Sequence, residues 1–215
     1  MSGEGTNLQA LLDAGLPVVA VASNIAGARA LERAEAVGVA TAAFPLEEFA
    51  GRDARDTAMG EWLEAQGVEL VVCAGYMHLL RPSFLARFPG RVVNVHPAPL
   101  PEFPGAHPLD DVLAAGAPAA AATVHFVDDG VDTGEVIASE PVPVLPGDTV
   151  DTLRARVHEV EHRLLPAVVR ELVDEGEASL APTEEGEASL APTDEATPAP
   201  ADEGEASLAP TRGGG

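Results

Sequence analysis

Short apolar runs alternate with amphipathic segments along most of this chain, and this alternation limits the fold more than any other feature. The apolar runs are rich in Val and Ala and are flanked by turn residues, which is typical of strands buried in a sheet. The segments between them carry apolar residues at helical spacing. We expect strands at 16–22, 39–44, 70–74, 92–96, 121–127 and 135–144, and helices at 7–14, 28–37, 53–66 and 149–173. The pattern predicts an α/β domain with a mostly parallel sheet between helices.

The C-terminal region has a different composition from the rest. The sequence GEASLAPT occurs at 176–183, 186–193 and 204–211. Glu, Ala, Pro, Gly and Ser dominate there, and so few bulky apolar residues cannot offset the entropy lost on ordering. We therefore expect a folded domain at 1–175 and an acidic, mostly disordered repeat tail at 176–215.

The first residues form a glycine-rich loop, Ser2 to Leu8 (SGEGTNL), that leads into the first expected helix. Such a loop usually follows a strand, yet no apolar run precedes it in this sequence. The interpretation is that the first strand of the sheet is missing, and that the start is truncated or misassigned. Backbone amides at the start of this helix are suited to bind a phosphate.

The charge of the chain argues against whole classes of partner. The formal net charge is −23 and every basic side chain is an arginine, so the clustered cations that nucleic-acid binding needs are absent. No apolar run reaches about 18 residues, and the N-terminus lacks the features of a secretory signal. Cys73 is the single cysteine and cannot form an internal disulfide. We expect a cytoplasmic protein without membrane or nucleic-acid partners.

The segment from Val92 to Pro101 (VVNVHPAPLP) carries the clearest chemical signal. Asn94 and His96 stand two residues apart at the end of an apolar strand, so both side chains lie on one face. An amide that holds a developing oxyanion beside an imidazole that moves a proton suits acyl transfer. The alternative is that Asn94 only ends the strand and that a backbone carbonyl caps His96.

A second polar segment runs from Val124 to Gly134 (VHFVDDGVDTG). Asp128 and Asp129 fit ordinary turn chemistry, whereas Asp132 is a better candidate for a carboxylate turned inward. Beside His96, such a carboxylate would favour the imidazolium. His125 is expected to pack within the sheet, and no set of residues has convincing metal-ligand spacing, so we expect no metal.

Together these segments resemble a known family. The segments at 2–8, 74–77, 94–107 and 125–134 occur in the order seen in folate-dependent phosphoribosylglycinamide formyltransferases, and the resemblance runs from Ser2 to about Val173. The Asn-x-His pattern with a later Asp marks formyltransferases in general. The loop at 2–8 and the sequence PGAH ending at His107 point to the phosphoribosylglycinamide branch. The resemblance implies a Rossmann-like formyltransferase fold.

The resemblance also implies roles for individual residues. The formyl donor would be 10-formyltetrahydrofolate, a co-substrate, and the acceptor would be the amine of 5-phosphoribosylglycinamide, as in de novo purine (IMP) biosynthesis. The implied catalytic residues are Asn94, His96 and Asp132; the implied substrate-binding residues are Gly5, Thr6, Asn7 and Glu161; and the implied folate-binding residues are Arg52, Met77, His78, Leu79, Leu80 and Asn94.

Some points depart from the family or stay open. His78 stands where the family often has arginine or lysine, which is tolerated if the backbone makes the pterin contact. A formyltetrahydrofolate hydrolase is an alternative, although that family carries a further N-terminal domain. A non-catalytic folate- or nucleotide-binding relative is another. The partners are expected to be small molecules, and the chain is expected to be a monomer or a homodimer.

Overall fold

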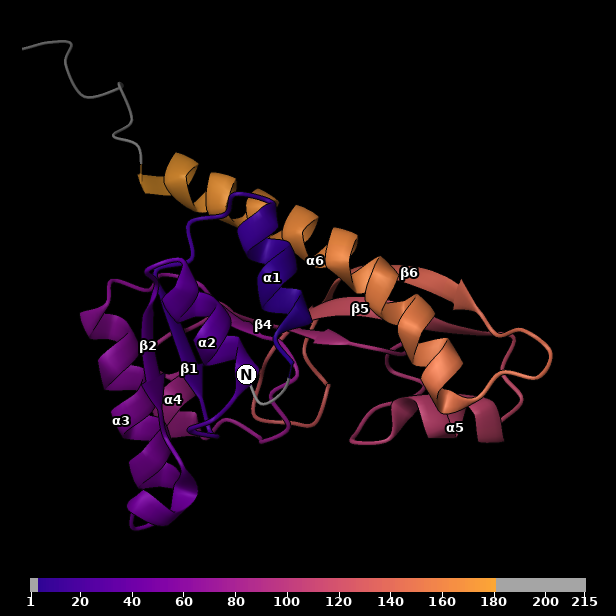
Figure 1. Ribbon diagram of the computed structural model, residues 1–215, viewed down its shortest axis with the longest axis horizontal. Coiled ribbons are helices and arrows are strands. Elements are labelled where there is room, and N and C mark those ends of the chain that lie inside the picture. The colour runs from indigo at the N-terminus through magenta and orange to yellow at the C-terminus, as the bar shows by residue number, and fades with distance from the viewer. Residues whose placement is uncertain (1–3, 181–215) are drawn as a thin grey trace, which may run out of the picture. The chain divides into compact units, whose positions relative to one another are not determined.

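The computed structural model describes residues 4–180 of the chain, and side chains as far as Gly176. Figure 1 shows an α/β arrangement in which helices cover the strands, as the sequence predicts. The strands are β1 (Ala20–Ser23), β2 (Ala40–Ala43), β3 (Val71–Cys73), β4 (Val92–His96), β5 (Ala119–Phe126) and β6 (Val136–Pro143). The helices are α1 (Thr6–Asp13), α2 (Arg29–Ala36), the 3₁₀ turn η1 (Leu46–Glu48), α3 (Arg52–Ala65), α4 (Pro82–Leu85), α5 (Pro108–Ala114) and α6 (Val150–Leu180).

The described strands form two sheets. One sheet pairs β1 with β2 in parallel. The other has the order β3-β4-β5-β6, in which β3 and β4 are parallel while β5 and β6 continue antiparallel. The sequence predicts a mostly parallel sheet with its first strand missing; the β1–β2 and β3–β4 pairs are parallel, and the antiparallel pairings are those of β5 with β4 and β6. The antiparallel β5–β6 pair is a hairpin, which needs no helical crossover.

β4 lies in the middle of the larger sheet and is buried on both sides, with only Asn94 half-exposed. Val93 and Val95 point toward α6 and pack with Leu165 and Val168. Val92 points to the opposite side, where it packs with Phe84 of α4. This alternation places Asn94 and His96 on the same side as Val92, at the carboxyl end of the strand.

Helix α6 extends along β5 and β6 with α1 beside it (Figure 1). The sequence predicts its end at Val173, whereas the helix continues to Leu180. Five residues of the predicted repeat tail, 176–180, are therefore helical. The rest of that predicted tail lies outside the described residues.

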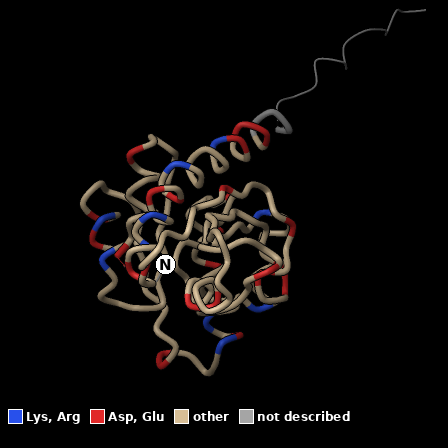
Figure 2. The backbone as a smooth tube through the Cα atoms, turned by 90° about the vertical axis from the view of Figure 1, so that its right-hand side faces the viewer, with Lys and Arg blue, Asp and Glu red and all other residues tan. Residues whose placement is uncertain are grey.

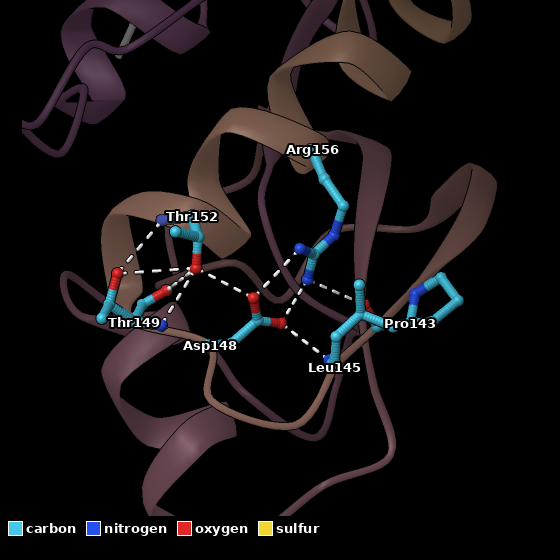
Figure 3. Close-up of polar contacts among 6 residues, drawn as sticks. All are labelled: Pro143, Leu145, Asp148, Thr149, Thr152 and Arg156. Atoms are coloured by element: carbon cyan, nitrogen blue, oxygen red, sulfur yellow. Dashed lines mark hydrogen bonds and ion pairs between the residues drawn. The ribbon is translucent and has the colours of Figure 1, made fainter.

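The start of α6 is fixed by a polar network around Asp148 and Thr149. The Thr152 amide donates to Thr149 Oγ1 at 3.3 Å, and the Thr149 amide donates to Thr152 Oγ1 at 2.9 Å. Figure 3 shows Asp148 at the centre, where it accepts from Thr152, Arg156 and the Leu145 amide. The Arg156 hydrogen bond and these other donors lower the pKa of Asp148.

Removing the cap should loosen this helix. Thr149→Ala is expected to lower the free energy of unfolding by about 1 kcal/mol, because the Thr152 amide loses its acceptor. Urea denaturation measures the change, and Thr149→Ser, which keeps the hydroxyl, is the matched control. An unchanged midpoint in Thr149→Ala would show that Asp148 alone holds the helix start.

Candidate active site

The site is built on the carboxyl end of β4. Asn94 lies opposite His125 of β5, and His96 lies opposite Thr123, in an antiparallel register. His96 is 4% exposed and His125 is 2% exposed, so both rings are buried beside the strand end. Their rings meet edge to face at 6.5 Å between centroids. One strand and its antiparallel neighbour therefore bring an amide and two imidazoles together.

The hydrogen bonds of His96 identify its active nitrogen. Its Nε2 lies 2.7 Å from the carbonyl oxygen of Phe103, which can only accept, so Nε2 carries a hydrogen. Its Nδ1 faces Asp132 Oδ2 at 3.5 Å. Nδ1 is thus the ring nitrogen that is not bound to the backbone and that faces a carboxylate. A separation of 3.5 Å is long for a hydrogen bond, and such contacts often tighten when substrate binds.

Asp132 is held in place by the backbone around it. Its φ of 51° lies in the left-handed region, which Asp tolerates better than most residues. The Gly105 amide donates to Oδ2 at 2.8 Å, which aims the carboxylate toward His96. Gly134 follows closely, and a Cβ there would lie 1.9 Å from the Phe126 carbonyl oxygen. The loop can close onto β5 in this way only with glycine at position 134.

His125 fixes the orientation of the Asn94 amide. Its Nδ1 lies 2.8 Å from the Phe126 carbonyl oxygen, so the hydrogen of the neutral ring is on Nδ1 and Nε2 is an acceptor. Nε2 lies 3.2 Å from Asn94 Nδ2, which must therefore donate. Burial lowers the pKa of His125 and keeps the ring neutral. The second Nδ2 hydrogen of Asn94 is left to point at a ligand.

These residues border a pocket of about 520 Å³, a size suited to a small-molecule site. Its lining includes nine of the predicted site residues: Asn7, Met77, His78, Leu79, Leu80, Asn94, His96, Asp132 and Glu161. Gly5, Thr6 and Arg52 are not part of this lining. Gly5 has a φ of 73° and packs so closely on Ala30 that a Cβ would lie 2.8 Å from the Ala30 Cα.

One side of the pocket joins α1 to α6. Asn7 Nδ2 donates to Glu161 Oε2 at 3.0 Å across 154 residues of sequence. Glu161 is 3% exposed, and burial raises its pKa above the ordinary value of 4.5. The Asn7 Oδ1 atom is buried and has no hydrogen-bond partner among the described residues. This pair presents an unused acceptor and a carboxylate beside the start of α1.

The opposite side is the loop between β3 and α4. Met77 and Leu79 are 66% and 48% exposed, so they offer an apolar surface at the pocket mouth. Beneath it, the buried Arg55–Asp56 ion pair holds the loop end, because Asp56 Oδ2 accepts from the Arg81 amide at 2.9 Å. Burial, then Arg55 and Arg52, lowers the pKa of His78. Arg52 therefore lies near this loop although it does not line the pocket.

Several lining residues were not predicted from the sequence. His125 was expected only to pack in the sheet, and its contact with Asn94 depends on the β4–β5 register. Arg154 and His158 also line the pocket. His158 stands three residues before Glu161 on α6, so helical spacing could have indicated it. The alternative that a backbone carbonyl caps His96 is confirmed, and the carbonyl is that of Phe103, a residue that no pattern singles out.

Ionisation of the Glu161 side chain lowers the free energy of unfolding, and an uncharged glutamine at this position avoids that loss. Because the folded-state pKa of Glu161 is raised, folding disfavours the carboxylate, and the resulting loss of stability grows as pH rises above 4.5. Glu161→Gln is expected to raise the free energy of unfolding at pH 7, by about 1.4 kcal/mol for each unit of pKa displacement, and to leave it unchanged near pH 3.

Denaturant titrations at pH 3 and pH 7 test this expectation. Glu159→Gln makes the same change at an exposed position of the same helix and should change stability little at either pH. A loss of stability in Glu161→Gln at pH 7 would show that the carboxylate is stabilised by its neighbours.

The described residues contain no group of three or more His, Cys, Asp or Glu side chains placed to hold a metal ion. Burial raises the pKa of Cys73 to about 11, which favours the neutral thiol at neutral pH. Within residues 4–180, no helix combines the length and apolar character needed to cross a membrane. Figure 2 shows acidic positions on every side of the chain trace, with arginines between them.

Several known proteins are similar to this chain in sequence and in fold. The formyl transferase family model matches residues 1–169. The phosphoribosylglycinamide formyltransferase of Mycobacterium tuberculosis is 45% identical over 179 residues, which is 81% of this chain and 83% of that protein. The trifunctional purine biosynthetic protein adenosine-3 of Drosophila melanogaster is 40% identical over 85% of this chain, but the chain spans only 14% of its length.

Solved structures agree with the sequence comparison. Phosphoribosylglycinamide formyltransferase from Streptococcus pneumoniae superposes with a TM-score of 0.77 at 46% identity, covering 80% of this chain and 95% of that one. Glycinamide ribonucleotide transformylase 1 from Symbiobacterium toebii gives a TM-score of 0.79 at 45% identity, covering 82% and 85%. The chain therefore belongs to the formyl transferase family and, within it, to the phosphoribosylglycinamide formyltransferases.

Proposed function

We propose that this chain transfers the formyl group of 10-formyltetrahydrofolate to the amine of 5-phosphoribosylglycinamide, a step in de novo purine biosynthesis. The observation that carries the proposal is the pairing of His96 Nδ1 with Asp132 at 3.5 Å, beside Asn94, on one pocket. The membership of the family supports formyl transfer and a folate-derived donor.

The chemistry needs an oxyanion site and a proton carrier. The amine attacks the formyl carbon, and the carbonyl oxygen of the resulting tetrahedral intermediate takes the negative charge. The free N–H of Asn94 and the protonated Nδ1 of His96 donate to that oxygen. As the carbon–nitrogen bond to tetrahydrofolate breaks, the amine loses a proton and the folate nitrogen gains one. Asp132, beside Nδ1, organises this transfer.

The two sides of the pocket divide the substrates between them. The backbone amides of Gly5, Thr6 and Asn7 at the start of α1 are suited to the substrate phosphate, and Glu161 to a ribose hydroxyl. The apolar loop at Met77, His78, Leu79 and Leu80, with Arg52 near it, is suited to the folate. Asn94 would meet the formyl group where the two substrates come together.

A direct assay tests the proposal. Tetrahydrofolate release from 10-formyltetrahydrofolate is measured with and without 5-phosphoribosylglycinamide, on the full chain and on His96→Ala. We expect release that requires the ribonucleotide and falls by at least about a hundredfold in the variant. Release without the ribonucleotide would indicate a hydrolase. Binding of both substrates without turnover would indicate a non-catalytic relative.

A further inference from the structure

Helix α1 begins without a side-chain cap. Gly5 is the residue before its first turn, and glycine has no side chain that could accept from the helix amides. The Gln9 amide donates to the Gly5 carbonyl at 3.0 Å, which is the first hydrogen bond of the helix. The amides of Gly5, Thr6 and Asn7 come before this bond, so none of them has an acceptor within α1. The way in which the chain enters α1 therefore decides where these amides point.

Arg33 of α2 holds the chain on both sides of these three amides. Its Nε donates to the Glu4 carbonyl at 2.9 Å, and its Nη1 donates to Gln9 Oε1 at 3.1 Å. Glu4 lies just before the amides in the sequence, and Gln9 lies in α1 just after them. The guanidinium is planar, and its donors have fixed directions. One rigid group therefore fixes the two ends of the segment 4–9 relative to each other.

The same segment rests directly on the backbone of α2. A Cβ at Gly5 would lie 2.8 Å from the Ala30 Cα, and Ala30 is fully buried. Ala30 and Arg33 stand three residues apart, which places them on one side of the helix. Figure 1 shows α1 and α2 next to each other. Helix α2 thus offers a surface for Gly5 and a hydrogen-bonding group for the residues around it.

Arg29, one turn earlier on α2, contacts the same segment in a weaker way. Its Nη1 pairs with the Glu4 carboxylate at 2.5 Å, but the two side chains are 62% and 65% exposed. An exposed ion pair contributes little to stability, and the carboxylate can move without moving the backbone. Arg29 is therefore a matched comparison for Arg33, because it is the same residue type on the same helix and contacts the same residue.

We propose that Arg33 is a positioning residue for the phosphate of the ribonucleotide substrate, an inference that rests on the proposed function. The guanidinium keeps the Glu4 carbonyl and the Gln9 side chain in place, so the amides of residues 5–7 stay in the arrangement that a phosphate needs. Without this contact, only a fraction of the molecules has that arrangement, and the apparent affinity falls by that fraction. The folate is proposed to lie on the opposite side of the pocket, so its affinity does not depend on Arg33.

Equilibrium binding to the full chain tests the proposal. The dissociation constants of 5-phosphoribosylglycinamide and of 10-formyltetrahydrofolate are measured separately by calorimetry, each without the other substrate. We expect Arg33→Met to raise the Kd of the ribonucleotide by at least about tenfold and to leave the Kd of the folate unchanged. Arg29→Met, the matched control, should change neither. Gln9→Met removes one of the two acceptors without altering α2, and it should raise the Kd of the ribonucleotide by about two- to tenfold.

Arg33→Lys separates positioning from charge. Lysine keeps the positive charge but lacks the rigid fork, so it should recover the affinity for the ribonucleotide only in part. Full recovery would assign the effect to charge and overturn the proposal, as would an equal rise of both dissociation constants in Arg33→Met. An unchanged Kd of the ribonucleotide in Arg33→Met would overturn the positioning role and leave the proposed function standing. An unaltered chain that fails to bind the ribonucleotide would overturn both.

Discussion

Asp132→Asn is expected to lower kcat by a factor of about 10² to 10⁴ while changing KM for either substrate little, because we propose that the carboxylate acts in proton transfer. Asn has the same shape but cannot hold a proton or stabilise an imidazolium. With His96 Nε2 bound to the Phe103 carbonyl, Nδ1 is the ring nitrogen left to face the pocket, and the Asp132 carboxylate lies 3.5 Å from it.

Asp132→Asn should leave the local structure unchanged, because the backbone conformation at this position accommodates asparagine. The φ of 51° at Asp132 is a conformation that Asn adopts as readily as Asp. The Asn Oδ1 atom can still accept from the Gly105 amide, which donates at 2.8 Å. We therefore expect the melting temperature to change little, so that the loss of rate reports chemistry.

Asp129→Asn is the matched control. It removes the same charge from the same loop, but Asp129 does not line the pocket, so its kcat should match that of the unaltered chain. Steady-state rates for both variants, with tetrahydrofolate release as the readout, make the comparison. Equal, small losses in the two variants would show that Asp132 acts only through the overall negative charge of the loop.

The elements of the fold follow from local patterns, and most of them could be predicted from the sequence. The prediction for β4, 92–96, agrees with its bounds in the structure because Val92, Val93 and Val95 are buried and turn residues flank the strand. The expected strand at 16–22 instead begins at Ala20, since Leu16 and Val18 pack on the α6 side before the chain joins the sheet. The end of α6 was missed because Glu and Ala favour helix even within a repeat.

Features of the site that lie within one strand could be predicted from the sequence. Features that depend on how strands and loops pair in the folded chain could not. The spacing of Asn94 and His96 indicates a shared face, and the structure places both on one pocket. The partner of each is set by tertiary structure: His125 faces Asn94 through the β4–β5 pairing, and the Phe103 carbonyl reaches His96 from a loop. The sequence allows for a backbone carbonyl as the partner of His96, but it cannot indicate which residue supplies it, because every residue carries one.

His125→Leu is expected to lower kcat by about a hundredfold, although the mechanism proposed above gives His125 no contact with the reacting atoms. Its Nε2 is the acceptor that holds Asn94 Nδ2 at 3.2 Å. Leucine offers no acceptor, so the Asn94 amide can rotate. Its free N–H would then leave the position that we propose for contact with the reacting oxygen, and misplacement of about 1 Å is enough for a loss of this size. His125→Gln, whose side-chain oxygen can accept the same hydrogen, should recover part of the rate. His162→Leu makes the same chemical change outside the pocket lining and should leave the rate unchanged.

The pH dependence separates this orienting role from a merely structural one. Burial, the largest influence, together with His96, lowers the pKa of His125, while the Phe126 carbonyl, Asp132 and Asp128 oppose the shift. The unfolded chain therefore takes up the proton first, and stability falls as pH drops below about 6.5. In the folded chain, protonation turns Nε2 into a donor that repels the Asn94 N–H. The acid side of the kcat profile should accordingly shift to lower pH in His125→Leu, and a profile that only scales down would contradict the orienting role.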